Sequence, residues 1–147
     1  MYDRQQRGTR DLLAVPRSAT RSDDPVERIG QAAEILGRAV LRRQGTVRVV
    51  VASTIAKPSA AKERPAHRFG FIRHALAPWA DRCDPAAHAD VERLVHGLAL
   101  VISAESLFAL IDLCDLPPDD AITTLAATAR HMTAAAVAAI PTVPAAD

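Results

Sequence analysis

The stretch LVHGLALVISAESLFALIDLCDLPPDDAI, residues 94–122, decides the fold of this 147-residue chain. Its pattern predicts a long apolar helix that stops at an acidic Pro-Pro turn, after which a second helix starts. From Leu98 to Leu113 nearly every face of the first helix is apolar. A helix that is apolar all round must be covered all round. One small domain of thin helices can cover one side, so we expect a partner subunit to cover the other.

Two long helices are predicted around this stretch. The first begins at Asp84-Pro85 and continues unbroken to about Cys114, which is roughly 45 Å at 1.5 Å per residue. The second opens after the Pro-Pro turn, ends near Ile140, and carries Asp119 and Asp120 in its first turn, where negative charge is favoured. Its apolar seam is made of small and medium side chains, namely Ile122, Leu125, Ala129, Met132, Ala136 and Ile140.

The start of the ordered region is predicted at Asp24. Asp24 can cap a helix, Pro25 suits its first position, and Glu27 can complete a capping box. Gly45 is expected to end this helix. The apolar stripe consists of Val26, Ile29, Ala33, Leu36 and Val40, with Arg28, Arg38 and Arg42 largely off it.

Residues 45–58, GTVRVVVASTIAKP, can be read in two ways. Their β-branched side chains favour a strand by propensity. Alternation fails at Val49-Val50-Val51, however, and no second convincing strand is present to pair with the segment. The one-sided placement of Val47, Val50, Val51, Thr54 and Ile55 therefore predicts a helix.

A further helix is predicted after a charged loop that lies between Pro58 and Pro65. It covers HRFGFIRHALAPWADRC, residues 67–83, and Pro78 should kink or end it. Its apolar stripe consists of Phe69, Ile72, Leu76 and Trp79. The fold class is therefore all-α: an antiparallel bundle of about five helices over residues 24–140.

The two ends of the chain lack these patterns. Residues 1–23 hold five arginines with little periodicity, which predicts a disordered basic segment. A flexible tail is the preferred interpretation, and an arm that binds DNA is the alternative. Pro141 and Pro144 end the last helix, so residues 141–147 are expected to be a frayed tail.

Composition narrows the functional classes. With 18 basic and 17 acidic residues, no global field draws the protein to nucleic acid or anionic lipid. The two cysteines, Cys83 and Cys114, make no disulfide framework and suit a cytoplasmic protein. There is no apolar signal core at the start and no uninterrupted apolar run of membrane-spanning length, so we expect no membrane span.

Catalysis and metal binding have little support. His88, Glu92 and His96 are four residues apart, so they share a helix face and offer two or three metal ligands. A polar helix face is the simpler interpretation. No HExxH, GxSxG, CxxC or phosphate-binding glycine loop is present. We therefore expect no enzyme, no metal site and no cofactor.

Several short motifs follow one another in the second half of the chain. The series begins with R-x-x-F-I-x-x-A-L-x-P at residues 68–78 and continues with LALVISAE at 98–105. DLCDL follows at 112–116, before a final Ala-rich helix. This ordered series resembles the C-terminal domain of TetR-type transcriptional repressors, and the resemblance covers about residues 24–139.

The resemblance implies a fold and a function. In that family the last two long helices of each subunit form a four-helix bundle across a two-fold axis, which would make this protein a homodimer. The interface would include Leu100, Leu107, Leu110, Leu125, Ala129, Met132 and Ala136. The preceding helices enclose a pocket for a small effector, expected here to be apolar. Candidate pocket residues are Val47, Val50, Val51, Phe69, Ile72, Leu76, Trp79, Leu94, Leu98 and Ile102, with Ser53, Arg73 and His74 as possible polar anchors.

One feature of the family is missing from the sequence. Members carry a helix-turn-helix in about their first fifty residues, whereas the 23 residues before Asp24 contain no such pattern. Operator recognition by that motif needs a helix in the major groove, so no sequence-specific operator binding is expected of the chain as written. Two interpretations stay open. The chain is the effector-binding domain of a truncated regulator, or it is a free-standing dimerisation module that acts through protein partners.

Overall fold

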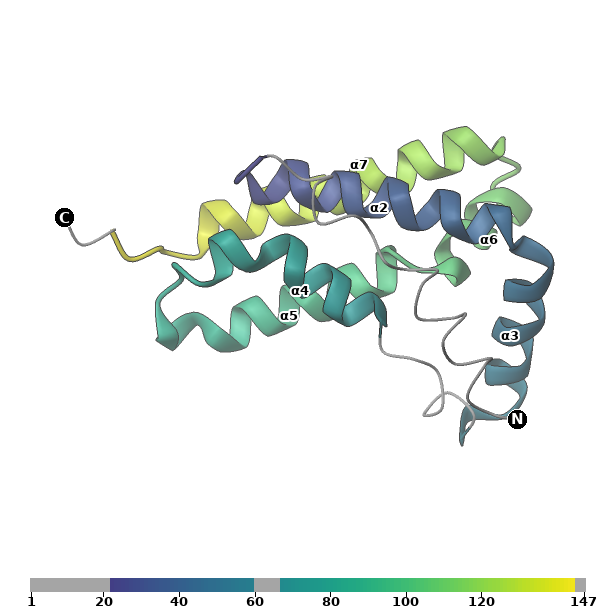
Figure 1. The fold of residues 1–147 in the computed structure, drawn as a ribbon, viewed down its shortest axis with the longest axis horizontal. Helices are drawn as coiled ribbons and strands as arrows, with labels where there is room; N and C mark the ends of the chain where they lie inside the picture. Colours follow the sequence, from purple (N-terminus) through teal and green to yellow (C-terminus); the bar gives the residue numbers. More distant parts are fainter. Residues whose placement is uncertain (1–21, 60–66, 145–147) are drawn as a thin grey trace, which may run out of the picture.

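The computed structural model describes residues 22–59 and 67–144, and the elements found there are helical except for one isolated β-bridge. Six α-helices and one 3-10 turn follow one another along the described chain (Figure 1). Their bounds are α2 Pro25–Arg42, α3 Gln44–Ala56, α4 His67–Ala80, η3 Pro85–Ala87, α5 His88–Val101, α6 Ala104–Asp112 and α7 Pro118–Ala139. The predicted all-α class is confirmed.

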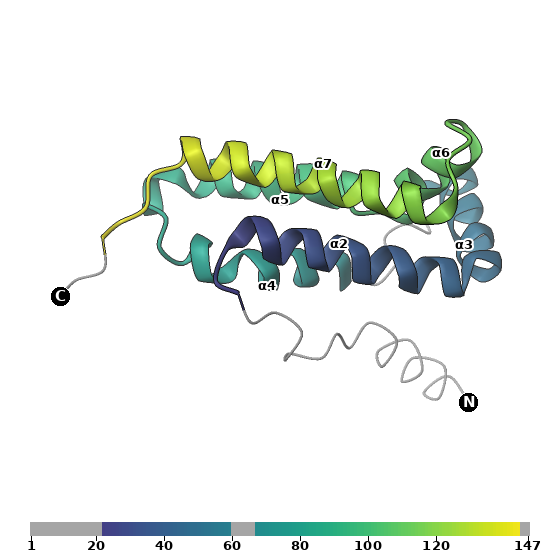
Figure 2. The ribbon, with the colours of Figure 1, turned by 90° about the horizontal axis from the view of Figure 1, so that it is seen from above.

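Four of the helices form an antiparallel bundle. Helix α2 packs against α7 and α4, and α5 packs against α4 and α7. Viewed from above, α2 and α4 make one layer and α5 and α7 the other (Figure 2). Helices α3 and α6 lie together at one end of this bundle. The core between the layers is mainly aliphatic, with Ile29, Leu76, Leu98 and Ile122 each at most 2% exposed.

Helix α2 starts as predicted and ends earlier. The Asp24 carboxylate accepts the amide of Val26 at 2.9 Å, and Pro25 occupies the first turn. Glu27 does not complete a capping box. Its carboxylate accepts a hydrogen bond from the Gln31 side chain, and the Asp24 amide donates to the Ser22 hydroxyl instead. Gly45 does not end the helix either. The chain turns at Arg43, and Gly45 lies in the first turn of α3.

The ambiguous β-branched segment is helical, as its one-sided pattern predicted. Helix α3 spans Gln44–Ala56 and buries only Val51 and Thr54. It rests on α6 and the end of α2. No strand lies beside this segment among the described residues. Its backbone N–H and C=O groups therefore pair with one another within the helix.

Helix α4 continues past Pro78 for two residues and stops at Ala80. Pro78 has no amide hydrogen, so the carbonyl oxygen of His74, four residues earlier, loses its helical donor. Arg28 of α2 supplies one: its Nη2 lies 3.0 Å from this oxygen, and its Nε lies 2.7 Å from the Ala75 carbonyl oxygen. Arg28 is therefore 7% exposed, which corrects its expected place off the buried stripe.

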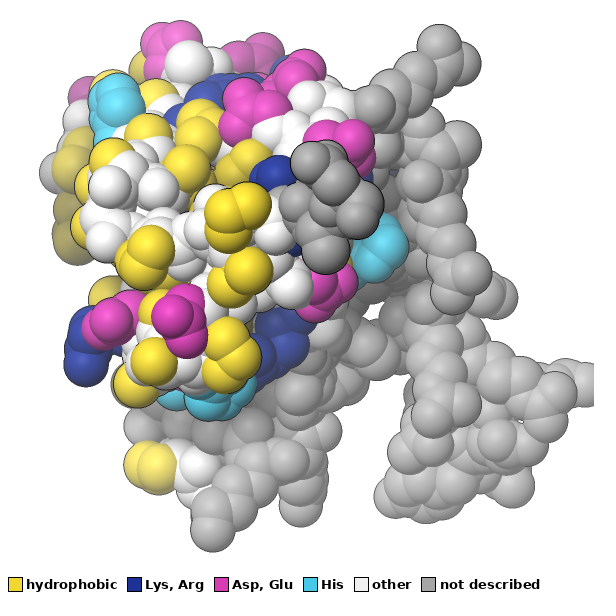
Figure 3. All heavy atoms as spheres, turned by 90° about the vertical axis from the view of Figure 1, so that its left-hand side faces the viewer, with side chains coloured by type: hydrophobic (Ala, Val, Ile, Leu, Met, Phe, Trp, Pro, Cys, Tyr) yellow, Lys and Arg dark blue, Asp and Glu magenta, His cyan; other side chains and the backbone are white. Residues whose placement is uncertain are grey.

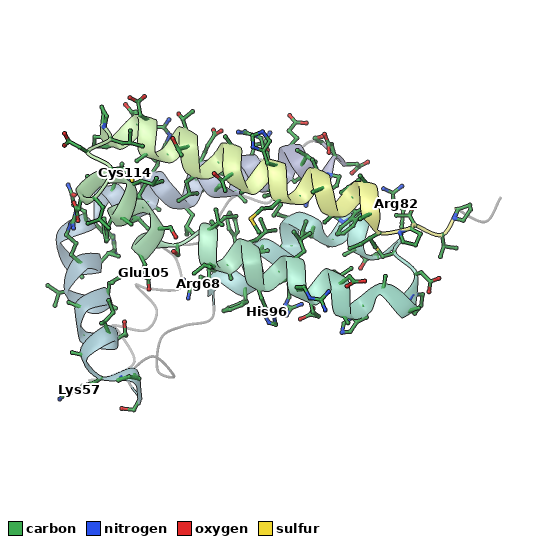
Figure 4. The ribbon with its side chains drawn as sticks, turned by 180° about the vertical axis from the view of Figure 1, so that it is seen from behind. Lys57, Arg68, Arg82, His96, Glu105 and Cys114 are labelled. Atoms are coloured by element: carbon green, nitrogen blue, oxygen red, sulfur yellow. The ribbon has the colours of Figure 1, made fainter. Side chains whose placement is uncertain are left out.

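The predicted unbroken helix from Pro85 to Cys114 is wrong. The chain breaks at Ile102 and Ser103, and the segments on either side are bent by 45°. Ser103 has an extended backbone, and its hydroxyl accepts the Ser106 amide at 3.1 Å, which is an N-cap. Glu105 in the first turn of α6 pairs with Arg68 of α4 at 3.7 Å (Figure 4). The break lets α6 fold back over the chain's own core.

Helix α7 begins and ends close to the predicted residues, with Asp119 and Asp120 in its first turn. Its seam faces α2 and α5. A Cβ on Gly37 of α2 would lie 3.0 Å from the Ile122 side chain, and one on Gly97 of α5 would lie 2.8 Å from the end of Met132. These glycines therefore permit the close approach of α7 to both neighbours.

Residues 141–143, the first part of the tail expected to be frayed, are hydrogen-bonded to the turn after α4. Thr142 forms an antiparallel bridge with Cys83. The Val143 amide donates to the Arg82 carbonyl oxygen at 2.7 Å, and the Asp84 amide donates to that of Pro141. The segment therefore ties α7 to the turn after α4. The predicted disorder of residues 1–23 falls mostly outside the described residues.

Within residues 22–59 and 67–144, no single helix has both the length and the apolar character of a membrane span. One bent pair, Pro85–Val101 with Ala104–Asp112, has them only when the two segments are taken together.

Candidate functional site

The structure divides the predicted pocket residues between two places. Those of α4, of α5 and of the break after α5 lie in or against the main core: Phe69, Ile72, Leu76, Trp79, Leu94, Leu98 and Ile102. The valines of α3 do not join them. Val51 and Val47 belong to a separate small cluster with Ala104 and Phe108 of α6. The described residues therefore do not bring the predicted set into one cluster.

Helix α3 presents its other apolar side chains to solvent. Val50 is 41% exposed, and Val49 and Ile55 are more exposed still. On its covered side, Arg48 stacks 4.1 Å above the Phe108 ring and binds Asp112 through both carboxylate oxygens. This contact was not predicted from the sequence, where a basic residue inside an apolar run was the available signal.

Trp79 is buried, and two of the three predicted anchors, Ser53 and Arg73, already have partners within the protein. Trp79 is 2% exposed, in the core. The Ser53 hydroxyl donates to the carbonyl oxygen of Val50 in its own helix. The His74 side chain is exposed, and Arg73 is ion-paired with Glu92.

An open groove of about 370 Å³ lies between α4 and α5. Drug-sized ligands occupy pockets of roughly 300–1,000 Å³, so the volume suits a small molecule. Both helices line it with one face each, and the turn between them closes one end. The lining residues are Arg73, Leu76, Ala77, Ala80, Asp81, Cys83, Asp84, Pro85, His88, Val91, Glu92 and Val95.

The groove has an apolar floor under a polar rim. Leu76 and Val95 are buried at its base, and Ala77, Ala80 and Val91 are half-buried beside them. Figure 3 shows the end of the molecule where α4 turns into α5, with acidic, basic and hydrophobic side chains intermingled on one surface. Of the residues predicted for the pocket, Leu76 and the possible polar anchor Arg73 line the groove.

An ion pair joins the two helices at the groove. Arg73 of α4 binds Glu92 of α5 in bidentate fashion, with Nη2 to Oε2 at 2.7 Å and a second bond from Nη1 to Oε1. The hydrogen bond from Arg73 lowers the pKa of Glu92, and the nearby charges of Arg73, His88 and His96 lower it further. The same pair raises the pKa of Arg73. Both groups are therefore charged at neutral pH.

The remaining polar rim comes from the turn and from α5. Asp84 caps η3 by accepting the Ala86 amide at 2.8 Å through Oδ1. Burial raises the pKa of the Cys83 thiol, which is therefore uncharged at neutral pH. Asp81 and His88 are exposed beside them. The spacing of Arg73, Ala77 and Asp81 was the available sequence signal, because residues four apart share a helix face.

Of the three residues His88, Glu92 and His96 on one face of α5, Glu92 is used in the ion pair with Arg73. Glu92 lies close enough to His88 and His96 to feel their charge, yet its two oxygens are bound by Arg73. The His96 ring meets Phe69 edge to face, with centroids 6.2 Å apart. Among the described residues, no group of three or more His, Cys, Asp or Glu side chains is placed to hold a metal ion.

The residues assigned to a dimer interface differ in exposure. Leu100 is 73% exposed. Leu110, Met132 and Ala136 are half-buried. The chain's own helices cover Leu107, Leu125 and Ala129, which are at most 3% exposed. A partner could therefore reach the first four residues without rearrangement of the core, and not the last three.

Comparisons of the chain with models of protein families, with curated proteins and with solved structures find no match.

Proposed function

We propose that this helical domain senses a small molecule in the α4–α5 groove and serves as the effector-binding and dimerisation domain of a TetR-type transcriptional regulator. The groove is the observation that carries the proposal. It combines a volume of about 370 Å³ with a buried aliphatic floor and a few charged groups at its rim. Ligand sites in proteins commonly have this composition.

The position of the groove suits a sensor. Its α4 side lies next to the proline turn that Arg28 of α2 stabilises. Its α5 side continues through Leu98 to the break at Ser103. A ligand that separated α4 from α5 would strain both places. The ligand would then bind the strained and unstrained conformations with different affinities, and a conformational response to a ligand requires this difference.

Ligand binding to the groove can be tested with a variant that fills it. We expect Ala77→Phe to block binding of an amphipathic probe such as 1-anilinonaphthalene-8-sulfonate, because the ring occupies the space above Leu76. Ala127→Phe, a half-buried alanine of α7 outside the groove, is the matched control. Calorimetric titration of wild type and both variants gives the dissociation constants. Equal affinities for all three proteins would exclude the groove as the site.

Dimerisation can be tested separately. The proposed interface centres on Leu100, with Leu110, Met132 and Ala136 around it. We expect Leu100→Glu to shift sedimentation from dimer to monomer, because a charge would have to be buried at the interface. Leu113→Glu is the control, since Leu113 is 84% exposed and lies outside the proposed interface. A wild type that sediments as a monomer at micromolar concentration would end this part of the proposal.

The alternative function is a helical module that acts through protein partners. The exposed Val49, Val50 and Ile55 on α3 favour it, because exposed large apolar side chains are available for contact with a partner. A photo-reactive residue at position 49 would identify the partner in cells. A cross-link to a TetR-type regulator supports the alternative, and cross-links to a second copy of the chain alone contradict it.

A further inference from the structure

The charges at the rim of the α4–α5 groove do not balance. Four groups of fixed charge line it: Arg73, Glu92, Asp81 and Asp84. Arg73 and Glu92 neutralise each other through two hydrogen bonds. Asp81 and Asp84 are left without a cationic side chain among the groove's lining residues.

Neither remaining carboxylate is paired elsewhere in the described chain. Asp84 accepts the Ala86 amide through Oδ1, which satisfies part of its capacity without neutralising its charge. Asp81 has no salt bridge with a described residue, and the neighbouring Arg82 turns its Nε to the carbonyl oxygen of Pro78 at 3.1 Å. Both carboxylates therefore face the groove end with unneutralised charge.

The floor below these carboxylates restricts the kind of cation. Leu76, Val95, Val91, Ala77 and Ala80 offer aliphatic carbon and no further oxygen ligands. Mg²⁺ and Ca²⁺ need about six or more oxygen ligands, so the groove would leave the coordination of a bare metal ion incomplete. An organic cation would bury its apolar body on the floor and keep its charge near the rim.

We propose that the α4–α5 groove binds a small organic cation with an apolar body, such as a quaternary onium ion, through the half-buried side chains of Ala77, Ala80 and Val91 and the carboxylates of Asp81 and Asp84. This inference rests on the proposed function and gives the chemical class of its effector. It also replaces the wholly apolar effector expected from sequence.

The test uses two probes of nearly equal shape and opposite charge, tetraphenylphosphonium and tetraphenylborate. Dissociation constants are measured by isothermal titration calorimetry with the full chain. We expect the cation to bind more tightly than the anion, and its affinity to fall as NaCl is raised, because exposed charge pairs are screened by salt. An anion that binds as tightly as the cation would overturn the inference.

Two double variants distinguish the effect of the groove carboxylates on affinity from the effect of the protein's net charge. Asp81→Asn with Asp84→Asn keeps the shape and the η3 cap, because asparagine also caps helices. We expect about a fivefold loss of tetraphenylphosphonium affinity, as two exposed charge contacts allow. The control, Asp115→Asn with Asp120→Asn, makes the same change in net charge at the α6–α7 end of the molecule and should leave the affinity unchanged.

The outcomes distinguish this inference from the function on which it rests. If both probes bind, Ala77→Phe weakens both, and the Asp81/Asp84 variant binds the cation like wild type, the groove is a ligand site without charge selection. If neither probe binds, or Ala77→Phe leaves binding unchanged, the groove is no site and both proposals fail. Ala80→Leu, a smaller groove-filling change, replaces Ala77→Phe if the circular dichroism of that variant shows a loss of helix.

Discussion

Arg28 donates a hydrogen bond to the carbonyl oxygen of His74 at 3.0 Å, the oxygen that Pro78 leaves without a donor in α4. The same guanidinium binds the Ala75 carbonyl oxygen at 2.7 Å and reaches the Ser22 carbonyl oxygen at 3.2 Å. Carbonyl oxygens near a helix C-terminus carry partial negative charge, which favours a cation there. A buried arginine thus compensates for a proline on another helix.

This relationship predicts coupling between the two positions. Arg28→Met should lower the free energy of unfolding by about 3 kcal/mol, because it removes charge-assisted hydrogen bonds and leaves a buried carbonyl unpaired. In a Pro78→Ala background the new amide of residue 78 can donate to His74, so the same change should cost less. Urea denaturation of the two single variants and the double variant measures the difference.

Additive effects of the two changes would contradict this account. Arg38→Met is the matched control, because Arg38 is an exposed arginine of the same helix that is 3.5 Å from Asp119. Its loss should change stability by less than about 1 kcal/mol, as is usual for surface ion pairs.

Ser103 is predicted to hold the break between α5 and α6. Ser103→Ala removes the hydroxyl that accepts the Ser106 amide and donates to the Leu100 carbonyl oxygen. We expect a loss of about 1 kcal/mol in unfolding free energy, typical of an N-cap. Ser53→Ala, in exposed α3, should be nearly neutral. Ser103→Ala as stable as wild type would mean that the break does not depend on this cap.

The Arg73–Glu92 pair predicts a pH dependence. Because the folded-state pKa of Glu92 is lowered, its contribution to stability is present above the unfolded carboxyl pKa and is lost as pH falls through the folded one. Wild type should therefore be more stable than Glu92→Gln near neutral pH, and the gap should close between about pH 5 and about pH 2. Thermal denaturation across this range tests it. A stability difference between wild type and Glu92→Gln that grows in acid would contradict this prediction.

Two glycines are predicted to be replaceable with a gain in stability. A Cβ on Gly45 or Gly70 would meet nothing within 4 Å, and both residues lie in helices. Gly45→Ala and Gly70→Ala should each stabilise the protein by about 0.5–1 kcal/mol. Gly37→Ala should gain less or lose, because its Cβ would lie 3.0 Å from Ile122. Denaturation midpoints compare the three, and an equal gain at Gly37 would contradict the tight α2–α7 contact.

Local patterns were enough for most of the helices. Asp24-Pro25 predicted the start of α2, and the acidic turn before Pro118 predicted the start of α7. The one-sided pattern of residues 47–55 correctly favoured a helix over a strand. These features depend on neighbours within a few residues, which the sequence displays directly. The dimer, the effector and the relation to TetR-type regulators stay predictions.

The break at Ser103 shows why periodicity alone was insufficient. Residues 98–113 are apolar on nearly every face, and an unbroken helix of this kind would need a partner subunit to cover it. The chain instead bends by 45° after α5, which turns Leu107 and Phe108 into its own core. The serine at the break is a weak signal, because the same residue is also found inside helices.

The sequence by itself determined an all-α fold, the places where α2 and α7 begin, and which face of α4 is apolar, because caps and periodicity are local. Only the tertiary structure decided that Arg28 is buried against α4, that the valines of α3 leave the expected pocket, and that Arg73, Asp81 and Glu92 meet at one groove. Each of these depends on contacts between residues distant along the chain, and their geometry follows from how whole helices pack.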